Sequence, residues 1–145
     1  MKLFTIGFTQ KSAREFFKKL KDNGVELLLD IRLNNTSQLA GFAKGEDLRF
    51  FIESFGMKYI HDTNLSPTEE ILKKYKKKEI DWKEYEILFN KLCDDRKINE
   101  YIIKKYIMLE NICLLCSEAT AEKCHRRLIA NRFKKMQNDI VIVNL

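Results

Sequence analysis

Apolar residues along the chain follow two different periods, and this pattern predicts strands that alternate with helices. Short, nearly continuous apolar runs are predicted as strands at residues 3–6, 26–32, 57–60, 112–116 and 140–143. Between these runs the apolar positions recur every three or four residues, the spacing of one helix face, as in Ala13, Phe16, Phe17 and Leu20. On this basis, helices are predicted to begin near residues 12, 48, 67, 81, 96 and 121.

The alternation of strands and helices indicates the class of fold. A strand followed by a helix and then another strand favours parallel pairing, with helices packed on both faces of the sheet. We therefore expect an α/β fold in which a single three-layer domain spans residues 1–145, with a mainly parallel sheet of about five strands flanked by helices. A length of 145 residues suits one compact domain, and we find no internal repeat and no linker.

Composition and charge narrow the choice of partners. The chain has 27 Lys and Arg residues against 21 Asp and Glu, a formal net charge of +6, and enough apolar residues (45%) for a folded core. This charge is compatible with an anionic small molecule or a nucleic acid as partner, although a solvated lysine surface is its commoner cause. No segment approaches the roughly 18 apolar residues of a membrane span, so we expect no membrane partner.

The amino terminus and the cysteines bear on localisation. The first residues form too short an apolar run for a secretory signal peptide and are predicted as a strand. Four cysteines without such a signal indicate a reducing compartment, in which they stay thiols unless they bind a metal or take part in chemistry. We therefore expect a cytoplasmic protein.

Chemically active side chains gather where the predicted strands end. In a parallel sheet, ligands bind beyond the carboxyl ends of the strands, because loops and helix N-termini converge there. The residues expected at these ends and in the polar loop after the second strand are Thr9, Asp30, Arg32, Asn34, Gln38, His61, Cys116 and Glu118. Cys124, His125 and Arg126 follow in the first turns of the last predicted helix. We expect these residues to form one site.

Cys116 and Cys124 are the candidate nucleophiles of this site. Cys116 lies where the strand gives way to the loop, and Cys124 lies near a helix N-terminus and two arginines, which lower the pKa of a thiol. His125 is the candidate general base, and Asp30 or Glu118 would orient the other groups or move protons. The alternative is that both thiols only pack beneath the loop.

Arg32 and Arg126 are the candidate anion-binding residues, because a guanidinium group matches the geometry of phosphate and carboxylate. The other residues assigned to substrate binding are Thr9, Asn34, Gln38 and His61. The alternative for Arg32 is a structural ion pair with Asp30. The two interpretations are compatible, since a carboxylate can hold an arginine in place for a ligand.

A metal site is a further alternative, which the sequence does not favour. Cys116, Cys124, His125 and His61 are residue types that bind zinc or iron, with Glu118 or Asp30 in support, but neighbouring residues on a helix point about 100° apart. Cys124 and His125 are therefore not expected to reach one ion, and we expect no bound metal. Cys113 and Cys116 have Cys-x-x-Cys spacing, yet residues three apart in a strand face opposite sides of the sheet. Cys113 is expected, like Cys93, to be a buried apolar residue.

Three motifs in the chain resemble a known protein family. They are Thr5-Ile6-Gly7, Asp30-Ile31-Arg32 and Cys116-x-Glu118-x5-Cys124-His125-Arg126, and together they resemble the family called domain of unknown function 488. The resemblance extends from Leu3 to Val143, and the last motif is its most specific part. The chain departs from many members at Phe8-Thr9 and Leu65-Ser66-Pro67. The resemblance implies a small α/β domain, and it supplies neither a reaction nor a cofactor.

Two functions are consistent with these residues. The preferred interpretation is a small enzyme that binds an anionic, phosphate- or nucleotide-like substrate through arginine and acts on it by Cys, Glu and His chemistry. The alternative is a non-catalytic module that binds nucleic acid or a nucleotide with the same arginines. In that case, substitution of the cysteines or the glutamate would leave binding almost unchanged, and salt would weaken binding strongly. A third option is that the Cys, Glu, His and Arg cluster only stabilises the fold.

Overall fold

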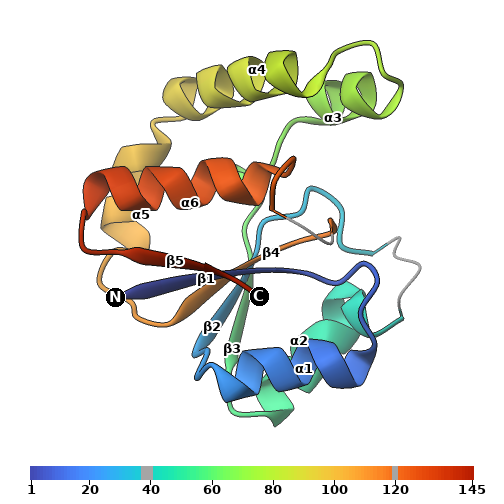
Figure 1. Cartoon of the computed structure of the whole chain (residues 1–145), viewed down its shortest axis with the longest axis vertical. Coiled ribbons are helices and arrows are strands. Elements are labelled where there is room, and N and C mark those ends of the chain that lie inside the picture. The colour runs from blue at the N-terminus through green and yellow to red at the C-terminus, as the bar shows by residue number, and fades with distance from the viewer. Residues whose placement is uncertain (37–40, 119–120) are drawn as a thin grey trace.

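A parallel sheet of five strands forms the centre of the molecule (Figure 1). The computed structural model describes residues 1–36, 41–118 and 121–145. Its strands are β1 (Lys2–Gly7), β2 (Leu27–Asp30), β3 (Lys58–His61), β4 (Ile112–Cys116) and β5 (Val141–Asn144). Their order across the sheet is β3-β2-β4-β1-β5, and every neighbouring pair is parallel. The predicted parallel sheet is confirmed.

Helices cover both faces of this sheet. The α-helices are α1 (Ala13–Asp22), α2 (Gly45–Ser54), α3 (Glu69–Lys76), α4 (Trp82–Asp95), α5 (Ile98–Lys105) and α6 (His125–Met136), and the short 3-10 helices are η1 (Gly41–Ala43) and η2 (Thr63–Leu65). Figure 1 shows α1 and α2 on one side of the sheet and α4, α5 and α6 on the other, which is the predicted α/β arrangement. None of the helices in the described part of the chain has both the length and the apolar character that crossing a membrane requires.

Alternating side chains of the strands contribute to two hydrophobic cores, one on each face of the sheet. In β4, Ile112 and Leu114 pack in the core that α4, α5 and α6 cover, while Cys113 and Leu115 pack in the core beneath α1 and α2. A strand that is buried on both faces needs apolar residues at every position, which explains the continuous apolar run of β4. Cys93 and Cys113 are buried in these cores, as predicted.

Helices α3, α5 and α6 begin later than the sequence predicts, and α2 begins earlier, at Gly45. Helix α3 begins at Glu69 with Thr68 as its N-cap residue, so Pro67 precedes the helix. Helix α6 begins at His125 and not near residue 121, because Cys124 has the extended backbone of an N-cap residue (φ −143°, ψ 141°). Cys124 therefore ends a loop, and it does not belong to a helical turn.

The carboxyl ends of β1, β2 and β4 lie side by side, and this arrangement positions the site. Gly7 of β1 lies opposite Cys116 of β4, and Asp30 of β2 lies opposite Leu115. A Cβ atom on Gly7 would lie 1.5 Å from the carbonyl oxygen of Glu118. Only glycine therefore lets the loop after β4 cross the end of β1 at this distance.

Asp62 links the end of β3 to α5. Its carboxylate accepts hydrogen bonds from the hydroxyl groups of Tyr101, within α5, and Tyr106, the C-cap residue of α5. It also accepts a hydrogen bond from the backbone amide of Asn64, and Lys105 lies 3.6 Å away. Burial alone would raise the pKa of this carboxyl, but the tyrosine hydroxyls and the other donors outweigh burial and lower it.

We predict that Asp62→Asn lowers the free energy of unfolding at pH 7 by about 1–3 kcal/mol, because it replaces the charged acceptor of two tyrosine hydroxyls. The folded-state pKa of Asp62 lies below the unfolded-state value, so its stabilisation is present above the unfolded-state pKa and is lost as pH falls through the folded-state pKa. The stability difference between wild type and variant should therefore shrink between pH 7 and pH 3. Urea unfolding at several pH values measures this difference in the free energy of unfolding. Asp22→Asn, at an exposed carboxyl, is the control, and a difference that does not depend on pH would contradict the prediction.

Candidate functional site

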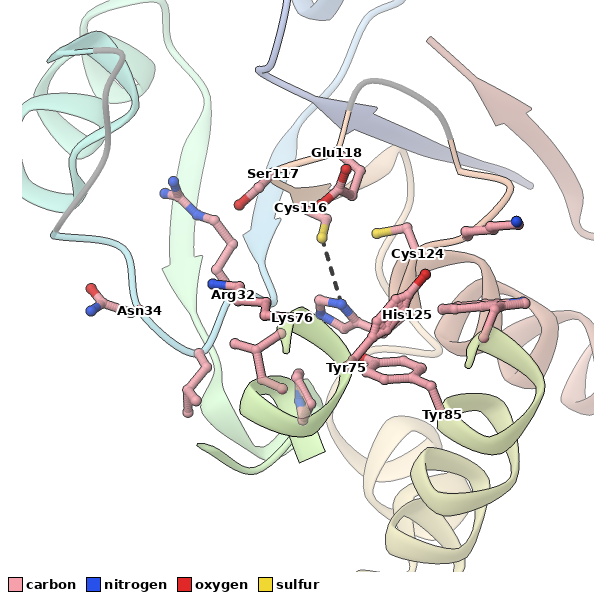
Figure 2. A pocket seen from close by; sticks show the side chains of 15 residues that line it. Arg32, Asn34, Tyr75, Lys76, Tyr85, Cys116, Ser117, Glu118, Cys124 and His125 are labelled. Carbon is pink, nitrogen blue, oxygen red and sulfur yellow. Dashed lines mark hydrogen bonds between the residues drawn. The ribbon is translucent and has the colours of Figure 1, made fainter. Parts of the chain in front are cut away.

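A pocket of about 380 Å³ opens at the carboxyl edge of the sheet (Figure 2). One wall comes from the chain after β2, the end of β4 and the start of α6, and consists of Arg32, Leu33, Asn34, Cys116, Ser117, Glu118, Lys123, Cys124 and His125. The opposite wall comes from α3, the start of α4 and the segment before α3, and consists of Pro67, Leu72, Tyr75, Lys76, Trp82 and Tyr85. The two cysteines and the histidine are buried, whereas the two lysines are exposed at the rim.

Cys116 and His125 form a hydrogen-bonded pair in this pocket. The Cys116 Sγ atom lies 3.5 Å from His125 Nδ1, and Figure 2 shows the sulfur and the ring facing each other. His125 Nε2 lies 2.8 Å from the carbonyl oxygen of Ile31, which can only accept a hydrogen bond. Nε2 therefore carries a hydrogen, and Nδ1 is left to exchange a proton with the Cys116 sulfur.

The electrostatics of this pair favour a thiolate and an imidazolium. A hydrogen bond from the Cys124 thiol and the nearby His125 lower the pKa of Cys116 well below its ordinary value, against the effect of burial. Burial alone would lower the pKa of His125, but the negative charge on Cys116 raises it. Burial and that same charge raise the pKa of Cys124 well above its ordinary value. The prediction of a lowered pKa at Cys124 is therefore wrong, and of the two thiols Cys116 is the candidate nucleophile.

Cys116, Cys124 and His125 also have the geometry of a set of metal ligands. One ligand atom from each lies within 4.8 Å of the others. The prediction that Cys124 and His125 diverge is wrong, because it assumed two residues of one helix, whereas Cys124 is the extended N-cap residue. Two thiolates and an imidazole suit zinc, and the Ile31 carbonyl would orient the His125 ring from its second nitrogen. Binding such an ion would require Cys124 to lose its proton.

A buried ion pair between Asp30 and Arg32 anchors the chain that follows β2. The Nε and Nη2 atoms of Arg32 donate to the two carboxylate oxygens of Asp30 at 2.8 and 2.7 Å. Nη2 also donates to the carbonyl of Ala43, and the Tyr59 hydroxyl donates to Asp30. The structural pairing that the sequence left open for Arg32 is therefore present. Its third nitrogen, Nη1, is buried with no hydrogen-bond partner among the described residues.

Thr9 and Arg126 stabilise the loop after β4 and are not among the residues that line the pocket. The Thr9 hydroxyl donates to the carbonyl of Ser117, and Arg126 Nη1 donates to the carbonyl of Glu118 at 2.6 Å. Arg126 is 1% exposed, so its guanidinium lies inside the protein and not on the pocket surface. The structure thus places both residues behind the loop that carries Glu118.

The remaining predicted binding residues take three different positions. Asn34 lines the pocket, as does Arg32. His61 does not line it, and its Nε2 atom lies 2.7 Å from the carbonyl oxygen of Arg32, where it donates a hydrogen bond that steadies the chain after β2. Gln38 lies outside the described residues. The sequence therefore identified the residues of this edge, but only some of their side chains reach the pocket.

Sequence reasoning missed the wall formed by α3 and α4. The rings of Trp82 and Tyr85 stack with their centroids 5.0 Å apart, and Tyr75 packs edge-on against both. The helical spacing of Trp82 and Tyr85 predicts only that they share a helix face, which describes a core residue equally well. Lys76 belongs to a lysine run that the helix dipole alone explains, so neither signal pointed to a pocket.

Comparisons with known proteins bear on this site. The family model described as "Domain of unknown function DUF488" matches residues 12–133 of the chain. This range contains every residue that lines the pocket, including Cys116, Cys124 and His125. No curated protein and no solved structure matches the chain. The resemblance seen in the sequence motifs is confirmed, and the chain belongs to the DUF488 family.

Proposed function

We propose that the protein is a small thiol-dependent enzyme that binds an anionic small molecule in the pocket and attacks it with the Cys116 thiolate. The observation that carries the proposal is the Cys116–His125 pair in the pocket wall, with Sγ and Nδ1 3.5 Å apart. His125 is the general base, because the Ile31 carbonyl fixes Nε2 as the protonated nitrogen and leaves Nδ1 toward the sulfur. This is the arrangement of an activated nucleophile whose base is oriented by a third group.

The reaction begins with transfer of the Cys116 thiol proton to His125 Nδ1. The thiolate then attacks an electrophilic atom of the substrate, which forms a covalent bond to Cys116 as the bond to the leaving group breaks. The imidazolium returns its proton to the leaving group, so charge and protons balance within the pocket. Cys116 and His125 are each 6% exposed, and this burial keeps water away from the thiolate.

The charges at the rim support an anionic substrate. Lys76 and Lys123 are exposed side chains that line the pocket, against the single carboxylate of Glu118, while the charge of Arg32 is balanced by Asp30. The aromatic wall that contains Trp82 suits a flat, apolar group next to the anionic one. A phosphate- or nucleotide-like substrate combines these two features and is the finer form of the proposal.

We predict that iodoacetamide alkylates Cys116 first among the four cysteines at pH 7, and that the rate changes little between pH 7 and pH 9. Because the pKa of Cys116 is lowered well below its ordinary value, we expect the thiolate at pH 7 and a rate that falls only as pH drops through that pKa. Burial raises the pKa of Cys93 to about 11 and also raises the pKa of Cys113, so both should react slowly. Peptide mass analysis of timed samples measures all four rates.

We predict that His125→Asn slows the alkylation of Cys116 at pH 7 by about tenfold for each unit by which the Cys116 pKa rises. The rate should then increase between pH 7 and pH 9, where the wild-type rate is flat. Cys113 in the same sample is the internal control, because faster labelling of this core residue would reveal an opened fold. Equal, slow alkylation of all four cysteines in the wild type would remove the nucleophile and favour the non-catalytic binding module.

Charge selection by the rim has its own test. The ratio of the Cys116 alkylation rates with iodoacetate, an anion, and iodoacetamide, which is neutral, should fall several-fold in Lys76→Glu/Lys123→Glu, because a positive rim concentrates anions. The matched control Lys18→Glu/Lys21→Glu makes the same charge change on α1, which does not line this pocket. High salt should reduce the wild-type ratio. An equal decrease in both double variants would mean that net charge alone sets the ratio.

A further inference from the structure

We propose that Cys124 is the second thiol of the reaction, so that the protein reduces a small anionic disulfide while Cys116 and Cys124 become joined to each other. This inference rests on the proposed function, since it requires Cys116 as the first nucleophile. It assigns the electrophilic atom of the substrate as a sulfur and the class of reaction as thiol–disulfide exchange.

The proposal stands on the positions of the four cysteines. The sulfur atoms of Cys116 and Cys124 lie within 4.8 Å of each other, and Figure 2 shows both directed into the same pocket. Cys116 ends β4, and Cys124 is the extended residue before α6, so both lie where loops begin or end. Cys93 and Cys113 lie in the two hydrophobic cores, apart from the pocket. The fold thus places two thiols, and only these two, at the proposed site.

The positions of the two thiols suit this order of events. Cys116 lies 3.5 Å from His125 Nδ1 and is the thiol that His125 activates first, while the Cys124 sulfur lies within 4.8 Å of the Cys116 sulfur. After the first exchange, His125 has given its proton to the released thiolate. His125, whose ligand atom lies within 4.8 Å of the Cys124 sulfur, can then accept the Cys124 proton.

The two steps balance in atoms and electrons. In the first, the Cys116 thiolate attacks one sulfur of R–S–S–R, the S–S bond breaks, and the released R–S⁻ takes a proton from His125. In the second, Cys124 loses its proton to His125 and attacks the Cys116 sulfur. The bond between Cys116 and the substrate sulfur breaks, and the released second R–S⁻ takes the proton from His125. Two thiols are oxidised to one disulfide, and one disulfide is reduced to two R–SH. A small external thiol of lower potential then restores the dithiol.

The pocket determines which disulfides can react. Cys116 is 6% exposed and Cys124 3% exposed, so a reagent reaches them through the pocket and not from a flat surface. A volume of about 380 Å³ admits a small molecule, which excludes most disulfides of folded proteins. Lys76 and Lys123 at the rim favour an anion, and the aromatic wall favours a ring beside the sulfur.

Two aromatic disulfides test the proposal. The probes are 5,5′-dithiobis(2-nitrobenzoate), which is anionic, and 2,2′-dipyridyl disulfide, which is neutral; both release a coloured thiol. With wild type, we expect a fast phase that releases two equivalents of thionitrobenzoate and leaves a Cys116–Cys124 disulfide with no attached probe. Cys124→Ser should release one equivalent and keep the probe on Cys116. Cys113→Ala is the matched control and should behave as wild type.

The two probes also test charge selection. The ratio of the reaction rate of the anionic probe to that of the neutral probe should be at least several-fold higher in wild type than in Lys76→Glu/Lys123→Glu.

The outcomes separate this inference from the proposed function. One fast equivalent with the probe retained in wild type would overturn the role of Cys124 and leave Cys116 as the nucleophile. The absence of a fast phase would overturn both. Thiols that react only after a chelator is added would overturn the exchange reaction in favour of a metal centre formed by Cys116, Cys124 and His125. The proposal is supported if wild type releases two equivalents and Cys124→Ser releases only the first. Peptide mass analysis would then locate the attached probe on Cys116 of the variant.

Discussion

The buried ion pair between Asp30 and Arg32 is the interaction on which the site depends. Burying a carboxylate and a guanidinium costs free energy unless their hydrogen bonds are satisfied, and here two parallel bonds, the Tyr59 hydroxyl and the Ala43 carbonyl supply most of them. The pair fixes the backbone directly after β2. The carbonyl of Ile31, which lies between the two charged residues, accepts the hydrogen bond from His125. The orientation of the proposed base therefore follows from an ion pair that does not itself react.

The loop after β4 is also held in place by residues that have no part in the proposed reaction. Gly7 lets the loop pass over the end of β1, the Arg126 guanidinium donates to the Glu118 carbonyl, and Thr9 donates to the carbonyl of Ser117. These contacts use backbone carbonyl groups, so they set the path of the loop without using its side chains. Cys116 is consequently fixed at the edge of a rigid sheet, within reach of the first residue of α6. Such rigid positioning is what a nucleophile and its base require.

Much of this could be predicted from the sequence, because it depends on local patterns and one topological rule. The apolar runs predict the strands, and the convergence of parallel strands at their carboxyl ends predicts that Arg32, Cys116 and His125 share an edge. The conformation of Cys124 could not be predicted, since the helix start depends on where the loop can cross β1. The direction of the Arg126 side chain and the aromatic wall at Trp82 depend on tertiary packing, which residue spacing does not encode.

The formal charges at the site support the proposal that one pocket combines a thiolate with an anionic substrate. Asp30 and Arg32 cancel each other, and so do the Cys116 thiolate and the His125 imidazolium, whose pKa values are displaced in opposite directions. The interior therefore carries no net charge that would repel an anion. At the rim, the two lysines exceed the one carboxylate of Glu118, which leaves a net positive charge where a substrate enters. In the proposed exchange, the released thiolate takes the proton of the imidazolium, so His125 becomes able to accept the proton of Cys124 only after Cys116 has reacted.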